Sequence, residues 1–241
     1  MPRYFSFALG NIWRWEKAKN KNSLLKYARS LDISGVELTI ETREKLYATK
    51  LSQKNISWLR SLKYVSIHAP FFLVKDSESQ EDLAKQLDAI AKLYKKVGAK
   101  NVIIHPDNLP APGILEKYEF NVSTENLPSR SNYKSSWLEN IFRKYKNIKF
   151  CLDASHAYTW SKRETEYLVK KYEPKISQIH FSGTIRKKPH QSFQKVSKDF
   201  FKSIKPLRNL DVPIVIEGDI KKKDIAFLKK EVEYIKKYFN G

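Results

Sequence analysis

The chain has 241 residues, 41% of them hydrophobic, which is enough for one domain with a sizeable core. Seven glycines and no polar low-complexity tract exclude a disordered chain, and a single cysteine excludes an internal disulfide framework. No run approaches the roughly 20 apolar residues of a membrane span, and the start MPRYFSFALGNIWRW lacks the apolar stretch of a signal peptide. We therefore expect a soluble cytoplasmic protein, monomeric and with no membrane partner.

The charge is strongly positive, at +20, from 46 Lys and Arg against 26 Asp and Glu. A field of this sign suits an anionic partner. Lysine-rich helix surfaces also arise from genome bias or heat adaptation, so the charge alone leaves both interpretations open.

Eight short β-like runs alternate with helical stretches, the pattern of βαβ units and a parallel sheet. Several of the runs are continuously apolar, as expected for strands buried on both faces. We therefore predict one (β/α)₈ barrel domain over residues 1–241, a fold of typically about 250 residues. The predicted strands are Tyr4–Leu9, Gly35–Ile40, Tyr64–His68, Asn101–His105, Phe120–Glu125, Lys149–Asp153, Ile176–Phe181 and Pro213–Glu217.

Helical periodicity fills four of the intervals between the strands. Residues 22–31, 80–97 and 224–239 carry apolar side chains at three- and four-residue steps. Gly98 is the expected C-cap of the second of these helices. Ser161 and Glu164 form a capping-box pattern that predicts a helix over residues 161–172. After the fourth strand there is space for only a short helix.

All five histidines close these runs or follow them. His68, His105 and His180 end strands, His156 lies just past the sixth strand, and His190 lies in the loop after the seventh. Carboxylates end further runs in the same way, at Glu125, Asp153 and Glu217. In a barrel the C-terminal ends of the strands meet at one face, where barrel enzymes keep their chemistry. The only cysteine, Cys151, lies inside an apolar run and is predicted to be a buried core thiol.

Imidazole and carboxylate together suit Zn²⁺ or Mn²⁺, and this set is too large for one ion. Each residue taken singly could be a satisfied polar group at a strand end. The repetition on successive strands favours a metal site with two or three divalent ions.

The chain resembles the xylose-isomerase-like barrel superfamily, and within it endonuclease IV, the abasic-site endonuclease. The resemblance covers nearly the whole chain. The motifs are His68-Ala-Pro-Phe-Phe, His105-Pro-Asp, Glu125-Asn, Asp153-Ala-Ser-His156, Ile179-His180, His190 and Ile216-Glu217.

This resemblance implies three ions. His68, His105 and Glu125 would hold the first, and Glu125 would bridge to a second ion. Asp153, His180 and Glu217 would complete the second site, and His156 with His190 would hold the third. The endonuclease has an aspartate ligand where this chain has Lys188, and the usual glycine-rich turn after the last histidine is absent. Either the third ion is weakly held, another carboxylate reaches in, or the site is dinuclear.

The resemblance implies a metal-dependent phosphodiesterase that incises damaged DNA at abasic sites. Aromatic and cationic side chains near the strand ends could contact DNA, because aromatics stack or wedge and cations neutralise phosphates. Phe71 and Phe72 could equally wall a sugar pocket, and a cationic run such as Arg186 to Lys188 is often a solvated loop. The candidate contact residues are Trp13, Arg14, Phe71, Phe72, Arg130, Arg186 and Lys188.

Two other functions stay open. The sugar isomerases and epimerases of the same superfamily resemble the chain at Glu125, Asp153, His180 and Glu217. There one ion would suffice, and Glu125 with Glu217 would be the catalytic acid/base pair. A sugar or sugar phosphate would then be the substrate. The third hypothesis, favoured by Lys188, is a nucleic-acid-binding module with a degenerate metal site.

Overall fold

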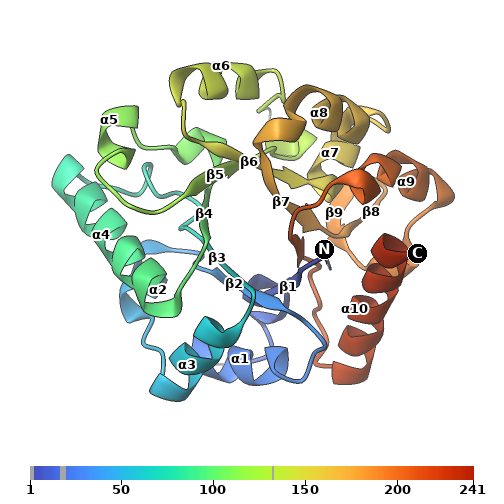
Figure 1. The fold of residues 1–241 in the computed structure, drawn as a ribbon, viewed down its shortest axis with the longest axis horizontal. Coiled ribbons are helices and arrows are strands. Elements are labelled where there is room, and N and C mark those ends of the chain that lie inside the picture. The colour runs from blue at the N-terminus through green and yellow to red at the C-terminus, as the bar shows by residue number, and fades with distance from the viewer. Residues whose placement is uncertain (1–2, 17–19, 132) are drawn as a thin grey trace.

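The computed structural model describes residues 3–16, 20–131 and 133–241, and it confirms the predicted (β/α)₈ barrel. Figure 1 shows the strands as a ring with the helices around it. All eight barrel strands are parallel, and β1 pairs with both β2 and β10 to close the ring. They are β1 (Phe5–Ala8), β2 (Gly35–Thr39), β3 (Tyr64–His68), β4 (Asn101–Ile104), β5 (Val122–Glu125), β6 (Lys149–Asp153), β7 (Ile176–Phe181) and β10 (Ile214–Ile216).

The two faces of each strand differ in polarity. On β7, Ile179 and Phe181 belong to the apolar core between strands and helices. Gln178 and His180 instead reach Glu37 of β2 across the lumen. Residues two apart share a strand face, so one row of each strand packs against the helices and the other lines the lumen. Both faces are buried, as predicted, but the lumen is largely polar.

The helices surround the strands, and most of them begin at a side-chain cap. The Ser79 side chain accepts the Asp82 N–H at the start of α4, and Gly98 ends this helix with the predicted left-handed C-cap, at φ 68°. The described helices include none that could cross a lipid bilayer. The helices are α1 (Lys21–Ala28), α2 (Arg43–Ala48), α3 (Gln53–Ser61), α4 (Gln80–Val97), α5 (Pro112–Leu115), α6 (Trp137–Lys144), α7 (Ala154–Trp160), α8 (Glu164–Tyr172), α9 (Lys198–Ser203) and α10 (Ile225–Asn240).

The predicted capping box at Ser161 is wrong. A separate helix, α7, starts directly after β6, because the Asp153 carboxylate accepts the backbone N–H of His156 at 2.6 Å. Ser161 is extended, with φ −160°, and ends α7, while α8 begins at Glu164 without a side-chain cap. The carboxylate at the strand end therefore starts a helix that the periodicity did not reveal.

The segment after β7 is a hairpin rather than a plain loop. Strands β8 (Gly183–Ile185) and β9 (Lys188–Gln191) are antiparallel, and Figure 1 shows them beside β7. Arg186 and Lys187 at its tip have φ 48° and 61°. A tight hairpin turn needs this left-handed pair, which usually comes from Asn-Gly. Arg-Lys gives no such signal, so the hairpin was not predicted.

Candidate metal centre

The strand-end histidines and carboxylates meet at one end of the barrel, as predicted. His68, Glu125 and Asp153 are the last residues of β3, β5 and β6, His180 lies in β7, and Glu217 directly follows β10. The first four are at most 2% exposed. Because all these strands are parallel, their C-terminal ends bring the side chains to a single mouth.

The eight predicted ligands form three clusters, in each of which the candidate ligand atoms lie within 4.8 Å of one another. These sets agree with the sets implied by the sequence resemblance, and Asp153 supplies the carboxylate that Lys188 cannot. We call them the His68 cluster (His68, His105, Glu125), the Glu217 cluster (Glu125, Asp153, His180, Glu217) and the His190 cluster (Asp153, His156, His190).

In the Glu217 cluster, a ring nitrogen and carboxylate oxygens converge in the barrel interior. His180 Nδ1 lies 3.1 Å from Glu125 Oε2 and 2.9 Å from Glu217 Oε2. These three buried atoms lie at ion-pair distances but are not aligned for hydrogen bonds, and Asp153 Oδ2 has no hydrogen-bond partner. Each unpaired buried polar group costs about 1–3 kcal/mol. Ligands about 2.1 Å from one ion lie roughly 3.0–3.4 Å apart, so the donor set fits a divalent cation.

The His68 cluster presents ring nitrogens to the other oxygen of Glu125. His68 Nδ1 lies 2.9 Å from the Ala69 carbonyl, and a proton donated there would leave Nε2 as the nitrogen that can bind an ion. That Nε2 is 3.9 Å from Glu125 Oε1, and His105 Nε2 is 3.0 Å from the same atom. Glu125 thus has one oxygen in each of two clusters, the arrangement of a bridging carboxylate.

The His190 cluster places two lone pairs face to face. Nε2 of His156 and Nε2 of His190 are 3.0 Å apart. Nδ1 of His156 lies 2.9 Å from the Asn126 carbonyl, and Nδ1 of His190 lies 3.1 Å from the Glu217 carbonyl. If each Nδ1 donates to its carbonyl, neither neutral ring has a proton left for the other. A cation between them would satisfy both.

Asn126 fixes the clusters to one another. Its side chain donates to the Asp153 carbonyl and accepts the Asp153 N–H, both at 2.9 Å. Its own carbonyl orients His156. Asn126 is 2% exposed and therefore satisfies its amide inside the site. The Glu125-Asn motif pointed to this position, but the sequence did not reveal its role.

The electrostatics suit cation binding. Burial opposes ionisation of Glu125, but the close ring nitrogens of His105, His180 and His68 hold its pKa well below the usual range. Burial likewise opposes the charge on His68, but the nearby carboxylate of Glu125 raises its pKa to about 9. The Glu217 carboxyl, despite burial, has its pKa lowered to about 2 by the neighbouring His180. Without an ion, protons on His68 and His180 therefore balance the carboxylates.

Cys151 is buried, as predicted, and burial raises its pKa to about 12. It nevertheless lies in the lumen, where its sulfur falls within 4.8 Å of ligand atoms of Glu125 and His180. A thiol with this pKa stays protonated at neutral pH, so it is a weak donor beneath the clusters rather than a ligand thiolate.

A cavity of about 740 Å³ opens above the ligand clusters. Five of the seven predicted contact residues line this cavity. They are Trp13, Arg14, Phe71, Arg130 and Lys188, and they lie there together with His190 and Glu217. The Phe71 ring stacks on His105 at 5.4 Å, with an angle of 3° between the rings. An aromatic face and several cations therefore border the entrance to the clusters.

Two predicted contact residues lie elsewhere. Phe72 does not line the cavity, and its side chain is 52% exposed. Arg186 at the hairpin tip lines a separate hollow with Trp160 and Lys187. The β8–β9 hairpin explains the position of Arg186. The hairpin brings Lys188 to the cavity wall and turns Arg186 away from it.

The cations of the cavity wall are only partly neutralised. Arg14 pairs with Asp219 at 2.5 Å, and Lys45 pairs with Glu41 at 3.2 Å. Within the described residues, Arg130, Lys188 and Lys221 have no ion-pair partner. The wall therefore keeps positive charge near the carboxylates.

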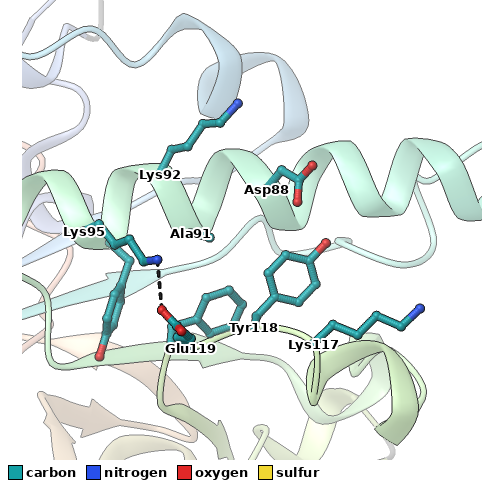
Figure 2. A pocket seen from close by; sticks show the side chains of 9 residues that line it. Asp88, Ala91, Lys92, Lys95, Lys117, Tyr118 and Glu119 are labelled. Atoms are coloured by element: carbon teal, nitrogen blue, oxygen red, sulfur yellow. Dashed lines mark ion pairs between the residues drawn. The ribbon is translucent and has the colours of Figure 1, made fainter.

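A further hollow, of about 490 Å³, lies between α4 and residues 117–120. Figure 2 shows its lining side chains, with Lys95 and Glu119 joined in an ion pair of 2.9 Å. None of its described lining residues belongs to the three clusters, so this hollow is separate from the candidate site.

Two positions near the ligands escaped the sequence analysis. Glu37 of β2 is fully buried and contacts His180, and Lys21 is a buried lysine bound to Glu41 at 3.0 Å. Glu37 sits inside an apolar strand, in Gly-Val-Glu-Leu-Thr. A charged residue inside a strand predicted to be buried on both faces was the available signal.

No protein-family model matches the sequence, and the curated proteins include no match. Solved structures do match. A D-tagatose 3-epimerase-like protein has 16% identity and a TM-score of 0.70, over 98% of this chain and 97% of its own. A xylose isomerase domain containing protein from Salmonella typhimurium has 15% identity and a TM-score of 0.72, over 99% and 97%.

Endonuclease IV from Thermus thermophilus is similar to the same degree, with 14% identity and a TM-score of 0.68, over 98% of this chain and 99% of its own. Several other similar structures are named as sugar epimerases. The chain therefore has the fold of the xylose-isomerase-like barrels. At these identities the likeness establishes the fold, while the reaction has to be argued from the site.

Proposed function

We propose that this protein is a metal-dependent phosphodiesterase that incises damaged DNA at abasic sites, with two or three Zn²⁺ or Mn²⁺ ions at the barrel mouth. One observation carries the proposal: all five histidines join carboxylates in three adjoining clusters. One ion would be satisfied by the Glu217 cluster. A single ion in that cluster would give no reason for the Nε2 atoms of His156 and His190 to face each other.

The chain's own residues supply the surroundings that such a reaction needs. Bound divalent ions would activate water and neutralise charge on the phosphate. Glu125, with one oxygen in each of two clusters, would hold those charges close together. Arg130, Lys188 and Lys221 add positive charge without ion-pair partners among the described residues, which suits a phosphate ester. Trp13 and Phe71 add aromatic rings to the cavity wall, the kind of side chain against which an exposed base or sugar packs.

A second candidate is a sugar or sugar-phosphate isomerase or epimerase. The names of most of the similar structures favour it, and so does the Glu217 cluster taken alone. Glu125 and Glu217 both approach His180 Nδ1, so they could flank one ion and exchange a proton with a substrate beside a carbonyl. In that reaction His68, His105, His156 and His190 would bind substrate.

The test is incision of a labelled duplex that carries one abasic site, by protein loaded with Zn²⁺ or Mn²⁺. Glu125→Gln removes the charge of the shared ligand and keeps its shape. Ser123→Ala, two residues earlier on the same strand face, is the matched control. We expect chelator-sensitive incision by the wild type and by Ser123→Ala, and none by Glu125→Gln.

Other outcomes select the other candidates. If the protein binds one ion and leaves the duplex intact, but interconverts sugars or sugar phosphates, the second candidate replaces the first. If it binds the duplex but holds no ion, it is a nucleic-acid-binding module with a degenerate metal site. Counting bound ions by mass spectrometry separates these cases before any assay.

A further inference from the structure

Glu37 is a carboxylate in the closed interior of the barrel, below the metal ligands. It is fully buried, and two donors and one ring nitrogen of His180 converge on its Oε2 atom, while its Oε1 atom has no hydrogen-bond partner. The Ser66 hydroxyl donates at 2.8 Å, the Gln178 amide nitrogen lies at 3.2 Å, and His180 Nε2 lies at 3.1 Å. A buried carboxylate is expensive unless it is paired and hydrogen-bonded, so its position calls for a reason beyond packing.

His180 can bind an ion through only one nitrogen. Its Nδ1 faces the carboxylates of Glu125 and Glu217, and its Nε2 faces Glu37. An ion at the Glu217 cluster needs the Nδ1 lone pair, so the remaining ring proton must stay on Nε2. A proton on Nδ1 instead would block the site.

Gln178 competes for the same ring nitrogen. Its Nε2 lies 3.0 Å from His180 Nε2. Its carbonyl oxygen is occupied, because it accepts from the Tyr64 hydroxyl at 2.7 Å and from the Asn101 amide at 3.0 Å. Gln178 is therefore held with its NH₂ group toward His180. Acting alone, it would donate to Nε2 and favour the tautomer with the proton on Nδ1.

We infer that Glu37 is a positioning residue for the metal centre: it keeps the proton of His180 on Nε2. The Nδ1 lone pair is then available to the ion. The inference rests on the metal centre of the proposed function and does not depend on which substrate is cut or isomerised. An acceptor behind a metal-binding histidine fixes the tautomer and ring orientation, and its loss typically weakens ion binding by about 10–100-fold.

The experiment compares four forms of the full chain: the wild type, Glu37→Gln, Ser66→Ala and the double variant Glu37→Gln with Gln178→Glu. Ser66→Ala removes a hydrogen bond from the same carboxylate oxygen without touching the ring. The double variant moves the acceptor to position 178, where Tyr64 and Asn101 already donate. Zn²⁺ affinity is measured by competition with a chromophoric chelator, and the tautomer of His180 by ¹H–¹⁵N NMR.

We expect Glu37→Gln to weaken Zn²⁺ binding at the Glu217 cluster by about 10–100-fold, and Ser66→Ala to weaken it by less than about threefold, the effect of one ordinary hydrogen bond. The double variant should recover most of the affinity. Far-UV circular dichroism and the melting temperature of the metal-free forms separate this effect from misfolding, since a purely structural role would lower stability without rescue by the swap.

The inference is overturned if Glu37→Gln folds and keeps wild-type Zn²⁺ affinity, or if the double variant folds and stays as weak as the single one. A wild type that binds no Zn²⁺ overturns it as well. If Zn²⁺ affinity depends on Glu37 but no duplex is cut, the positioning role stands and the phosphodiesterase proposal fails.

Discussion

The barrel lumen has two layers of side chains, two residues apart on the same strands. The layers differ in how far their polar groups are hydrogen-bonded. In the lower layer Ser66, Asn101, Ser123 and Gln178 bond to one another or to Glu37, at 2.8–3.2 Å. In the upper layer the ligand atoms of the Glu217 cluster make no aligned hydrogen bonds. The lower layer satisfies most of its polar groups internally, with Glu37 Oε1 left without a partner, whereas the upper layer is complete only with a cation, so stability and ion binding should be separable by mutation.

The largest effect is expected at the ligand shared by two clusters. Glu125→Gln should weaken ion binding more than about 100-fold, since a direct ligand matters more than the groups behind it. The metal-free fold should survive, because a neutral amide removes a buried charge. Chelator competition and thermal melting check both statements. An unchanged ion affinity in Glu125→Gln would mean that the ligands are assigned wrongly.

A mutation on the outer strand face is expected to lower stability without changing ion affinity. Phe150→Ala empties a fully buried position that packs against Phe142 and Tyr172. It should lower the free energy of unfolding by about 3–5 kcal/mol and leave ion affinity per folded molecule unchanged. Denaturant unfolding of the metal-free protein gives the first quantity. A parallel loss of ion affinity at full folding would show that the two faces are coupled.

The metal-free protein should lose stability toward alkaline pH. The folded pKa of His68 is about 9, above its ordinary value of 6.5. Its protonation therefore stabilises the fold fully below pH 6.5, and that contribution is lost as the pH rises through 9. It amounts to at most about 3 kcal/mol.

Denaturant unfolding between pH 6 and 9.5 measures this slope, and His68→Gln should remove most of it. Saturating Zn²⁺ should oppose the trend, because ions bind deprotonated ligands. A flat profile for the metal-free wild type would contradict the ion pair between His68 and Glu125 as the cause of the raised pKa.

The smallest effect concerns the position that departs from the endonuclease pattern. Lys188 lies two residues before His190 on β9. Lys188→Asp replaces a positive charge by a possible ligand and should strengthen ion binding at the His190 cluster by up to about tenfold, or 1.4 kcal/mol. Lys187→Asp at the exposed hairpin tip is the charge-matched control. Equal gains in both variants would indicate a general charge effect rather than a new ligand.

Sequence by itself determined the barrel and predicted which histidines and carboxylates gather at its mouth. Alternating apolar runs and helical periods identify eight strands, and parallel strands bring their C-terminal residues to one mouth. His68, Glu125, Asp153 and His180 could therefore be grouped in advance. The helix starting at Asp153 was missed because its cap is a ligand candidate at a strand end, outside any helical period.

Only the tertiary structure decided which atoms meet. The hairpin that brings His190 to His156 depends on the left-handed backbone conformation of Arg186 and Lys187. Neither residue type predicts a turn. The contact of Glu37 with His180 joins strands 143 positions apart, across the barrel. Local patterns report which face a residue occupies, whereas barrel closure and register set which side chain stands opposite, and so which proton or ion each atom can share.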